Sequence, residues 1–143
     1  MVFKLRVTCI LGRFLEEECV RTIAMHESSS LYDLHEVIQA AVSFGRDHPF
    51  TFYTANSGSP WAEQNWIAEE EEWADMERAF DETTLADIWP LGRKKLYYWF
   101  DFRDKWIFEI RKMRSNKEDA KLAVPMILAR VGPDPRQYGR EGL

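Results

Sequence analysis

Cysteine is scarce in this sequence, and its placement argues against a structural metal site. Cys9 and Cys19 are the only cysteines among 143 residues, and no Cys-x-x-Cys or His-x3-His spacing is present. Structural zinc sites use four ligands in such short pairs, so zinc is not favoured. The two thiols could pair with each other or join a histidine. We interpret them as small strand residues in a reducing compartment.

Long apolar segments are also missing. No run approaches the roughly 20 apolar residues that span a bilayer. The first residues, Met-Val-Phe-Lys-Leu-Arg-Val, alternate between apolar and basic or other side chains. A signal peptide has a basic stretch followed by an apolar one instead. We therefore expect a cytoplasmic protein without a membrane partner.

The common catalytic motifs are absent as well. The sequence contains no Gly-x-Ser-x-Gly nucleophile elbow, no glycine-rich phosphate loop and no His-Glu-x-x-His helix. Each of these motifs supplies a nucleophile, a phosphate cradle or a pair of metal ligands at a fixed spacing. We predict no cofactor, and the sequence leaves open whether the protein is an enzyme.

Charge is plentiful but unevenly distributed. The net charge of the chain is −5, yet residues 61–87 hold 10 acidic and 1 basic side chains, whereas residues 88–143 hold 7 acidic and 13 basic ones. An acidic middle beside a basic final third is the clearest electrostatic feature of the sequence, and segments that partly neutralise each other or stay solvated would explain it.

Apolar periodicity predicts an α+β fold in a single domain over residues 1–143. Alternation predicts a hairpin over residues 3–25 and a strand at 49–54. A second, aromatic hairpin is predicted at 96–110, with Asp101 inside its first strand. Apolar residues at helical spacing predict one principal helix at about 31–44, with Ser30 and Asp33 as its N-terminal capping box and Gly45 near its C-terminus.

Three segments are less regular. Residues 61–83 are interpreted as an acidic excursion with one short helix, and residues 84–89 as a helical turn. Residues 122–128 fit either an edge strand or a short helix, because Pro125 interrupts the run. A hairpin followed by a long helix predicts a mixed sheet with the helix packed on it, in a β-grasp-like arrangement with extra C-terminal strands.

Several of these segments resemble the plasmid pRiA4b ORF-3-like family, some of whose members are labelled passenger proteins of insertion elements. The matching residues are 31–41, 48–52, 84–88, 98–106 and 131–138. The family commonly has glycine at position 103, here Arg103, and histidine at position 108, here Phe108. The first departure argues against a turn with positive φ, and the second removes the residue most suggestive of metal or proton chemistry. The resemblance implies a fold, and a mobile-element setting, more than an activity.

The best acidic constellation is Asp101 and Asp104, with His35 as a third candidate member. Two carboxylates three residues apart could hold a divalent cation, since Mg²⁺ and Ca²⁺ prefer oxygen ligands. A metal-dependent hydrolase using these residues is therefore one hypothesis. Alternatively, Asp101 accepts backbone amides and Asp104 is a turn residue, with His35 at the edge of the core. We predict no bound metal on this second interpretation.

Basic residues flank the aromatic hairpin and form the candidate binding surface. Its members are Arg93, Lys94, Lys95, Arg111 and Lys112, with Trp99 and Trp106 as aromatic neighbours. Basic side chains among exposed aromatics suit single-stranded nucleic acid, whereas a pI of about 5.3 argues against it. Solvated strand ends would explain the same cluster.

A third surface is defined by four tryptophans around the acidic segment, Trp61, Trp66, Trp73 and Trp89. Aromatic residues are enriched in protein interfaces, although they also fill the space beneath long loops. Taken together, the residues favour a binding or adaptor module with nucleic acid or a protein as partner. The hydrolase is the alternative.

Overall fold

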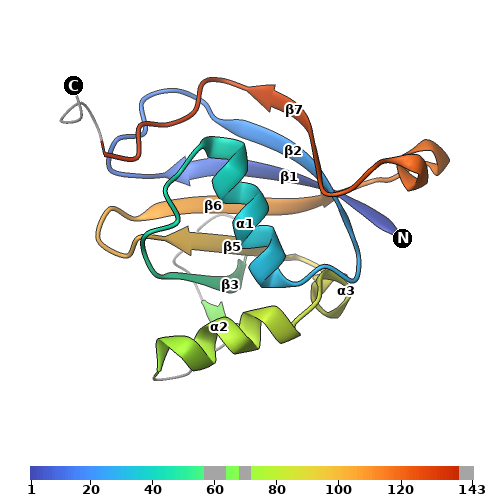
Figure 1. Ribbon diagram of the computed structural model, residues 1–143, viewed down its shortest axis with the longest axis horizontal. Helices are drawn as coiled ribbons and strands as arrows, with labels where there is room; N and C mark the ends of the chain where they lie inside the picture. The colour runs from blue at the N-terminus through green and yellow to red at the C-terminus, as the bar shows by residue number, and fades with distance from the viewer. Residues whose placement is uncertain (57–63, 68–71, 139–143) are drawn as a thin grey trace.

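The protein is described from a computed structural model, in which residues 1–56, 64–67 and 72–138 are placed. A seven-stranded sheet carries one principal helix (Figure 1). The strands are β1 (Val2–Leu11), β2 (Val20–His26), β3 (Phe50–Asn56), β4 (Asn65–Trp66), β5 (Lys94–Phe100), β6 (Trp106–Met113) and β7 (Met126–Val131). The helices are α1 (Leu31–Val42), α2 (Trp73–Glu82), α3 (Leu85–Ile88) and the 3-10 helix η1 (Lys117–Lys121).

The strand order is β4-β3-β5-β6-β1-β2-β7, and every pairing in this described sheet is antiparallel. The expected mixed sheet is therefore wrong, and the β-grasp-like detail is not confirmed. The cause is the β6–β1 pairing: the second strand of the aromatic hairpin runs opposite to its neighbour β1. The broader prediction of an α+β domain with one principal helix on the sheet is confirmed.

Helix α1 begins where its capping box predicts. The Ser30 hydroxyl accepts from the Asp33 amide at 3.0 Å, and the Ser30 amide donates back to Asp33 at 2.9 Å. These bonds satisfy amides that the first helical turn leaves without a partner. The helix ends earlier than predicted, because Ser43 rather than Gly45 takes the left-handed conformation at its C-terminus.

One face of the sheet, which we call the inner face, packs against α1 (Figure 1). The inner face contains every second residue of the central strands: Leu5, Val7 and Cys9 from β1, Leu96, Tyr98 and Phe100 from β5, and Trp106, Phe108 and Ile110 from β6. Cys9 and Cys19 are buried free thiols, as expected. Burial raises the pKa of both thiols, which therefore stay protonated.

Trp106 and Gly12 show how tightly this layer is packed. The Trp106 side chain is fully buried, and a Cβ atom at Gly12 would lie 2.0 Å from its ring. Trp106 also contacts Phe44, with 4.9 Å between ring centroids. The prediction that Trp106 belongs to an exposed binding surface is therefore wrong, because its alternation with Ile107 places it on the inner face.

The opposite, outer face of the sheet contains a smaller cluster of buried side chains: Tyr53, Ala55, Tyr97 and Ile107. Trp99 packs on its edge. Aromatic residues on both sides of β5 had predicted a central strand, and β5 indeed lies between β3 and β6. The last apolar run is strand β7 at the sheet edge rather than a helix. Trp61 and the acidic residues 69–71 of the predicted excursion lie outside the described residues.

Candidate functional site

Strands β5 and β6 separate at one end of the aromatic hairpin, and this separation creates the candidate site. Their pairing begins at Leu96 opposite Ile110. Beyond that point Lys94 and Lys95 pair with β3, whereas Arg111 and Lys112 pair with β1. The described sheet therefore has a fork whose two arms each carry basic residues.

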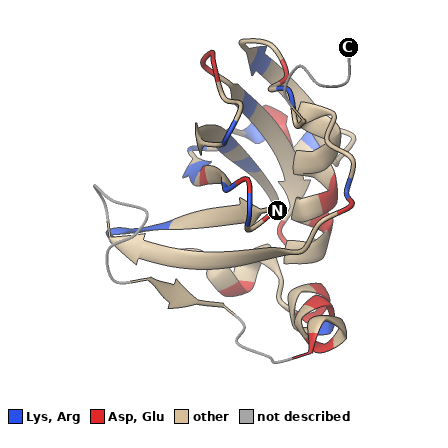
Figure 2. Ribbon diagram, turned by 90° about the vertical axis from the view of Figure 1, so that its left-hand side faces the viewer, with Lys and Arg blue, Asp and Glu red and all other residues tan. Residues whose placement is uncertain are grey.

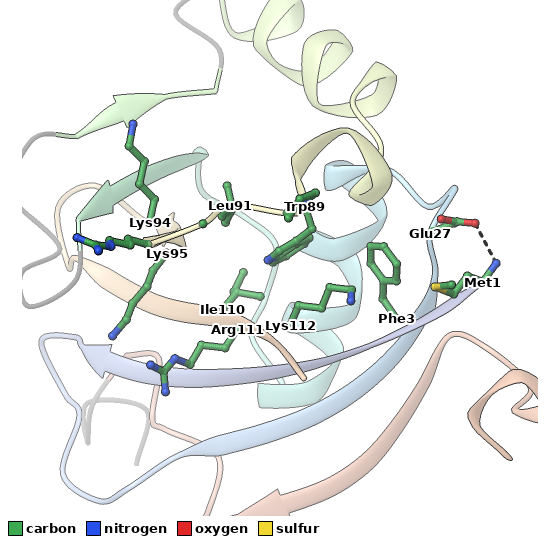
Figure 3. Close-up of a pocket in the computed structure, with 13 residues that line it drawn as sticks. Met1, Phe3, Glu27, Trp89, Leu91, Lys94, Lys95, Ile110, Arg111 and Lys112 are labelled. Carbon is green, nitrogen blue, oxygen red and sulfur yellow. Dashed lines mark hydrogen bonds and ion pairs between the residues drawn. The ribbon is translucent and has the colours of Figure 1, made fainter. Parts of the chain in front are cut away.

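The fork opens into a groove of about 740 Å³. We call it the basic groove, because all five predicted basic residues line it: Arg93, Lys94, Lys95, Arg111 and Lys112. Apolar residues form the rest of its wall, among them Phe3, Trp89, Leu91 and Ile110 (Figure 3). A volume of this size suits a small ligand or a short segment of a polymer.

Local contacts hold three of these cations in place. The Lys95 ammonium lies 3.3 Å from one oxygen of Glu109, and Arg111 lies 3.5 Å from the other. The Lys112 ammonium lies 4.7 Å from the centre of the Phe3 ring. The single Glu109 carboxylate thus pairs with two cations, so positive charge remains in excess at the fork.

Only one acidic residue, Glu27, belongs to the described lining of the groove. Its carboxylate binds the amino group of Met1 at 3.0 Å (Figure 3). This pair lies at the end of the groove away from Lys94. The potential at the fork is therefore set by the lysines and arginines of the two arms.

The described helices and the outer face of the sheet differ in charge. Helices α1, α2 and α3 hold seven carboxylates and one arginine. The outer face of the sheet carries Lys4, Arg6, Lys95 and Arg111 against Glu109. Figure 2 shows the acidic α2 on the helical side of the molecule and basic segments on the strands.

The predicted acidic constellation is only partly assembled. Asp101 and Asp104 lie in the turn between β5 and β6, and one oxygen of Asp101 accepts the amides of Arg103 and Asp104 at 3.2 Å each. Asp104 lies 3.5 Å from the Arg13 guanidinium. Asp101 follows β5 rather than belonging to it, and its φ of 60° is left-handed.

Positive φ occurs in this turn after all, at Asp101 and at Lys105. The expectation drawn from Arg103 is therefore wrong, because the turn uses left-handed residues at its two ends and not at position 103. Aspartate tolerates this conformation because its short polar side chain bonds the local backbone. The Asp101 carboxylate bonds the local backbone by accepting hydrogen bonds from the two amides.

His35 does not meet the two aspartates. It lies on the buried side of α1, stacked on Phe50 with 3.7 Å between ring centroids, and its Nδ1 hydrogen-bonds the Tyr98 hydroxyl. Because Gln39 donates to that hydroxyl at 3.0 Å, the hydroxyl proton goes to Nδ1 and the histidine proton is on Nε2. Burial, with the nearby Arg46, lowers the pKa of His35 to about 4, so the ring is neutral.

His48 is the histidine beside Asp101, and the sequence had not identified it. Its Nε2 lies 3.6 Å from the second oxygen of Asp101. Pairing of Phe50 with Phe100 places His48 next to the turn, so correct pairing of β3 with β5 would have identified it. In the described part of the chain, no group of three histidine, cysteine or carboxylate side chains is arranged to hold a metal ion.

Of the two predicted aromatic neighbours, only Trp99 is on the surface side of the sheet. It lies on the outer face, half-buried, two residues from Tyr97 and four from Lys95. Trp89 and Leu91, which the sequence did not assign to this site, form a wall of the basic groove.

No helix in the described chain is long and apolar enough to cross a membrane.

Comparisons with known proteins identify the fold and the family. A crystal structure of a protein of unknown function from Methanosarcina mazei Go1 has a TM-score of 0.64 to this chain and 20% sequence identity, with 90% of this chain and 68% of the other covered. No curated protein matches the sequence. The sequence model of the plasmid pRiA4b ORF-3-like proteins matches residues 2–137. The chain therefore belongs to the plasmid pRiA4b ORF-3-like family.

Proposed function

We propose that this protein is a binding module whose basic groove takes the phosphate backbone of single-stranded nucleic acid. The observation that carries the proposal is the convergence of five basic side chains from two separate segments on one groove. Phosphates attract such clusters without regard to base sequence, and the release of their counterions drives binding. A mobile-element setting is part of the proposal, and it rests on the family resemblance and the family's plasmid-derived name alone.

A single strand is favoured over a duplex because the groove also has an apolar wall. Trp89 and Leu91 are half-buried at the groove, beside the exposed Lys94. The flat faces of unpaired bases can contact such side chains, whereas a duplex keeps its bases stacked inside. An acidic protein segment would satisfy the charges but would make less use of the aromatic surface.

The turn at Asp101 supports a module rather than an enzyme. One oxygen of the carboxylate accepts hydrogen bonds from two backbone amides and so holds the turn, and the other lies 3.6 Å from His48 Nε2. His35 is committed to Tyr98 on the inner face. The metal-dependent hydrolase that would use Asp101, Asp104 and His35 therefore lacks its histidine, and we do not favour it.

The test is binding of a fluorescent oligothymidine of about 12 nucleotides, within the usual range of single-strand sites. Arg111→Glu with Lys112→Glu should abolish binding, because both arms of the fork are needed to hold the phosphates. The matched control is Lys117→Glu with Lys121→Glu, which changes the net charge equally at exposed residues of η1. We expect the control to bind within about twofold of the wild type, because neither lysine lines the groove.

Salt dependence gives a second criterion. Contact with five phosphates predicts a slope of about −3.5 for log K against log salt concentration when the wild type binds a single strand. Equal weakening in the groove variant and the control, or no binding by the wild type, would overturn the proposal. Tighter binding of polyglutamate than of oligothymidine would replace nucleic acid with an acidic protein partner.

A further inference from the structure

Three aromatic side chains form a continuous row on the outer face of the sheet. Trp66 and Trp99 are stacked, with 6.3 Å between ring centroids and 27° between planes. Trp99 and Phe102 meet edge to face at 5.1 Å. We call these three residues the aromatic row.

The two ends of the aromatic row face solvent. Trp66 is 36% exposed and Phe102 is 43% exposed, and both belong to short segments at the margin of the fold. Large aromatic side chains are seldom left in water side by side, and exposed patches of this kind mark interaction sites. The row therefore has the character of a contact surface.

Buried tyrosines support the row from beneath. Tyr53 and Tyr97 are stacked at 5.3 Å, and both are almost completely buried. Tyr53 also contacts Trp66 at 5.1 Å. Because the layer below is packed, the exposed rings are held in place before any ligand arrives, which reduces the entropy lost on binding.

The row lies on the same face of the sheet as Lys95 of the basic groove. Lys95, Tyr97 and Trp99 alternate along β5 and so lie on the same face of the sheet. Trp99 is four positions after Lys95, a distance of about 13 Å along the strand at roughly 3.3 Å per residue. Tyr97 between them is buried, so a polymer bound at Lys95 passes over this stretch and reaches the row within a few nucleotides.

Positive charge also flanks the far end of the row. Arg103 and Lys105, on either side of Asp104 in the hairpin turn, are both exposed next to Phe102. Between the two basic ends, the side chain of Glu109 is already bound by Lys95 and Arg111. The path therefore has cations at both ends and aromatic rings in the middle.

We propose that a single strand of nucleic acid runs from the basic groove to the aromatic row and stacks its bases on the two exposed ends of the row, Trp66 and Phe102. This inference rests on the proposed function, which it extends from the phosphates to the bases. Stacking on aromatic rings accepts every base, so the site binds single strands with little sequence preference. Duplexes, whose bases are not available, bind through the groove alone.

The experiment compares two probes with equal numbers of phosphates, oligothymidine and an abasic oligomer of the same length, on the wild type and on Trp66→Ala with Phe102→Ala. The wild type should bind oligothymidine about tenfold more tightly than the abasic probe. The double variant should lose this preference and should bind the abasic probe as the wild type does. Both residues are exposed, so the fold is retained, and a thermal melt checks it.

Trp66→Tyr with Phe102→Tyr is the matched conservative variant, because it keeps an aromatic ring at each position. This variant should restore the preference for oligothymidine to within about threefold, since tyrosine also stacks on bases. Equal binding of the two probes by the wild type would overturn the inference while leaving the groove proposal intact. Failure of both probes to bind would instead overturn the groove proposal itself.

Discussion

The two faces of strand β5 carry neighbouring residues with different tasks. On the inner face, the Tyr98 hydroxyl is bonded to His35 and Gln39 beneath α1, and no charged group is involved. On the outer face, Lys95 shares a carboxylate with Arg111 at the mouth of a groove. Successive side chains of a strand point to opposite faces of the sheet. One position therefore helps to specify the fold, and the next contributes to a binding surface. Substitutions on the inner face should therefore change stability more than binding, and substitutions on the outer face should change binding more than stability.

The largest effect should come from comparing tryptophans on the two faces. Trp106→Ala removes a fully buried ring, and we expect a loss of about 3–5 kcal/mol in the free energy of unfolding. Trp66→Ala, on the outer face, should cost about 1 kcal/mol or less. Urea denaturation measures both. Similar losses in the two variants would show that the outer face contributes to the core as much as the inner face does.

Acid should weaken the inner face through His35. The pKa of this ring is about 6.5 when unfolded and about 4 when folded, because burial disfavours its charged form. Between these values the unfolded state binds more protons, so stability is highest above pH 6.5 and falls as the pH drops toward 4. The full difference is about 3 kcal/mol.

The comparison that isolates this effect is His35→Phe against the exposed His26→Ala, with urea unfolding measured at pH 7 and at pH 4. His35→Phe should remove most of the 3 kcal/mol difference that acid causes at this site. The His26→Ala variant should retain this difference in unfolding free energy between pH 7 and pH 4. An unchanged acid sensitivity in His35→Phe would mean that carboxylates, and not the buried ring, weaken the fold.

The turn that joins β5 to β6 should give the smallest of these effects. Asp101→Ala loses two amide hydrogen bonds and places alanine at a φ of 60°, for a cost of about 2–3 kcal/mol. Asp104→Ala loses a 3.5 Å contact with the largely exposed Arg13, for about 1 kcal/mol or less. Thermal melts with and without Mg²⁺ measure both. A rise in melting temperature with the metal that both variants abolish would return the hydrolase to consideration.

The sequence predicted the elements that depend on neighbouring residues. The capping box at Ser30, the apolar stripe of α1 and the aromatic hairpin are local patterns, and the structure contains all three. The basic groove was also within reach, because folding a hairpin necessarily brings residues 93–95 close to residues 111 and 112. What the hairpin could not show is that its strands separate there and leave a space.

Long-range pairing was not predictable from the sequence in the same way. Aromatic residues occur on both sides of β5, so the pattern did not say which ring faces the helix, and Trp106 was placed on the wrong side. His48 meets Asp101 only through the pairing of β3 with β5. Local periodicity contains no information on such pairings, because they depend on which strands become neighbours.

Arg21 is a further residue that the sequence did not mark. It lies on the same face of β2 as the apolar Ile23 and Met25, is 1% exposed, and donates to the Ala41 carbonyl at 3.0 Å and to Asp134 at 2.7 Å. The carbonyls near the end of α1 favour a cation there. The segment that follows β7 supplies the carboxylate, which the sequence separates from Arg21 by more than a hundred residues.

The division of charge between the helices and the strands has a consequence for how the protein meets a polyanion. With carboxylates on one side and basic residues on the other, the molecule has an electric dipole even though its net charge is −5. In the field of a nucleic acid, the protein turns before contact, and its strands face the phosphates. Encounters that reach the groove then become more frequent than the net charge alone predicts, most clearly at low ionic strength.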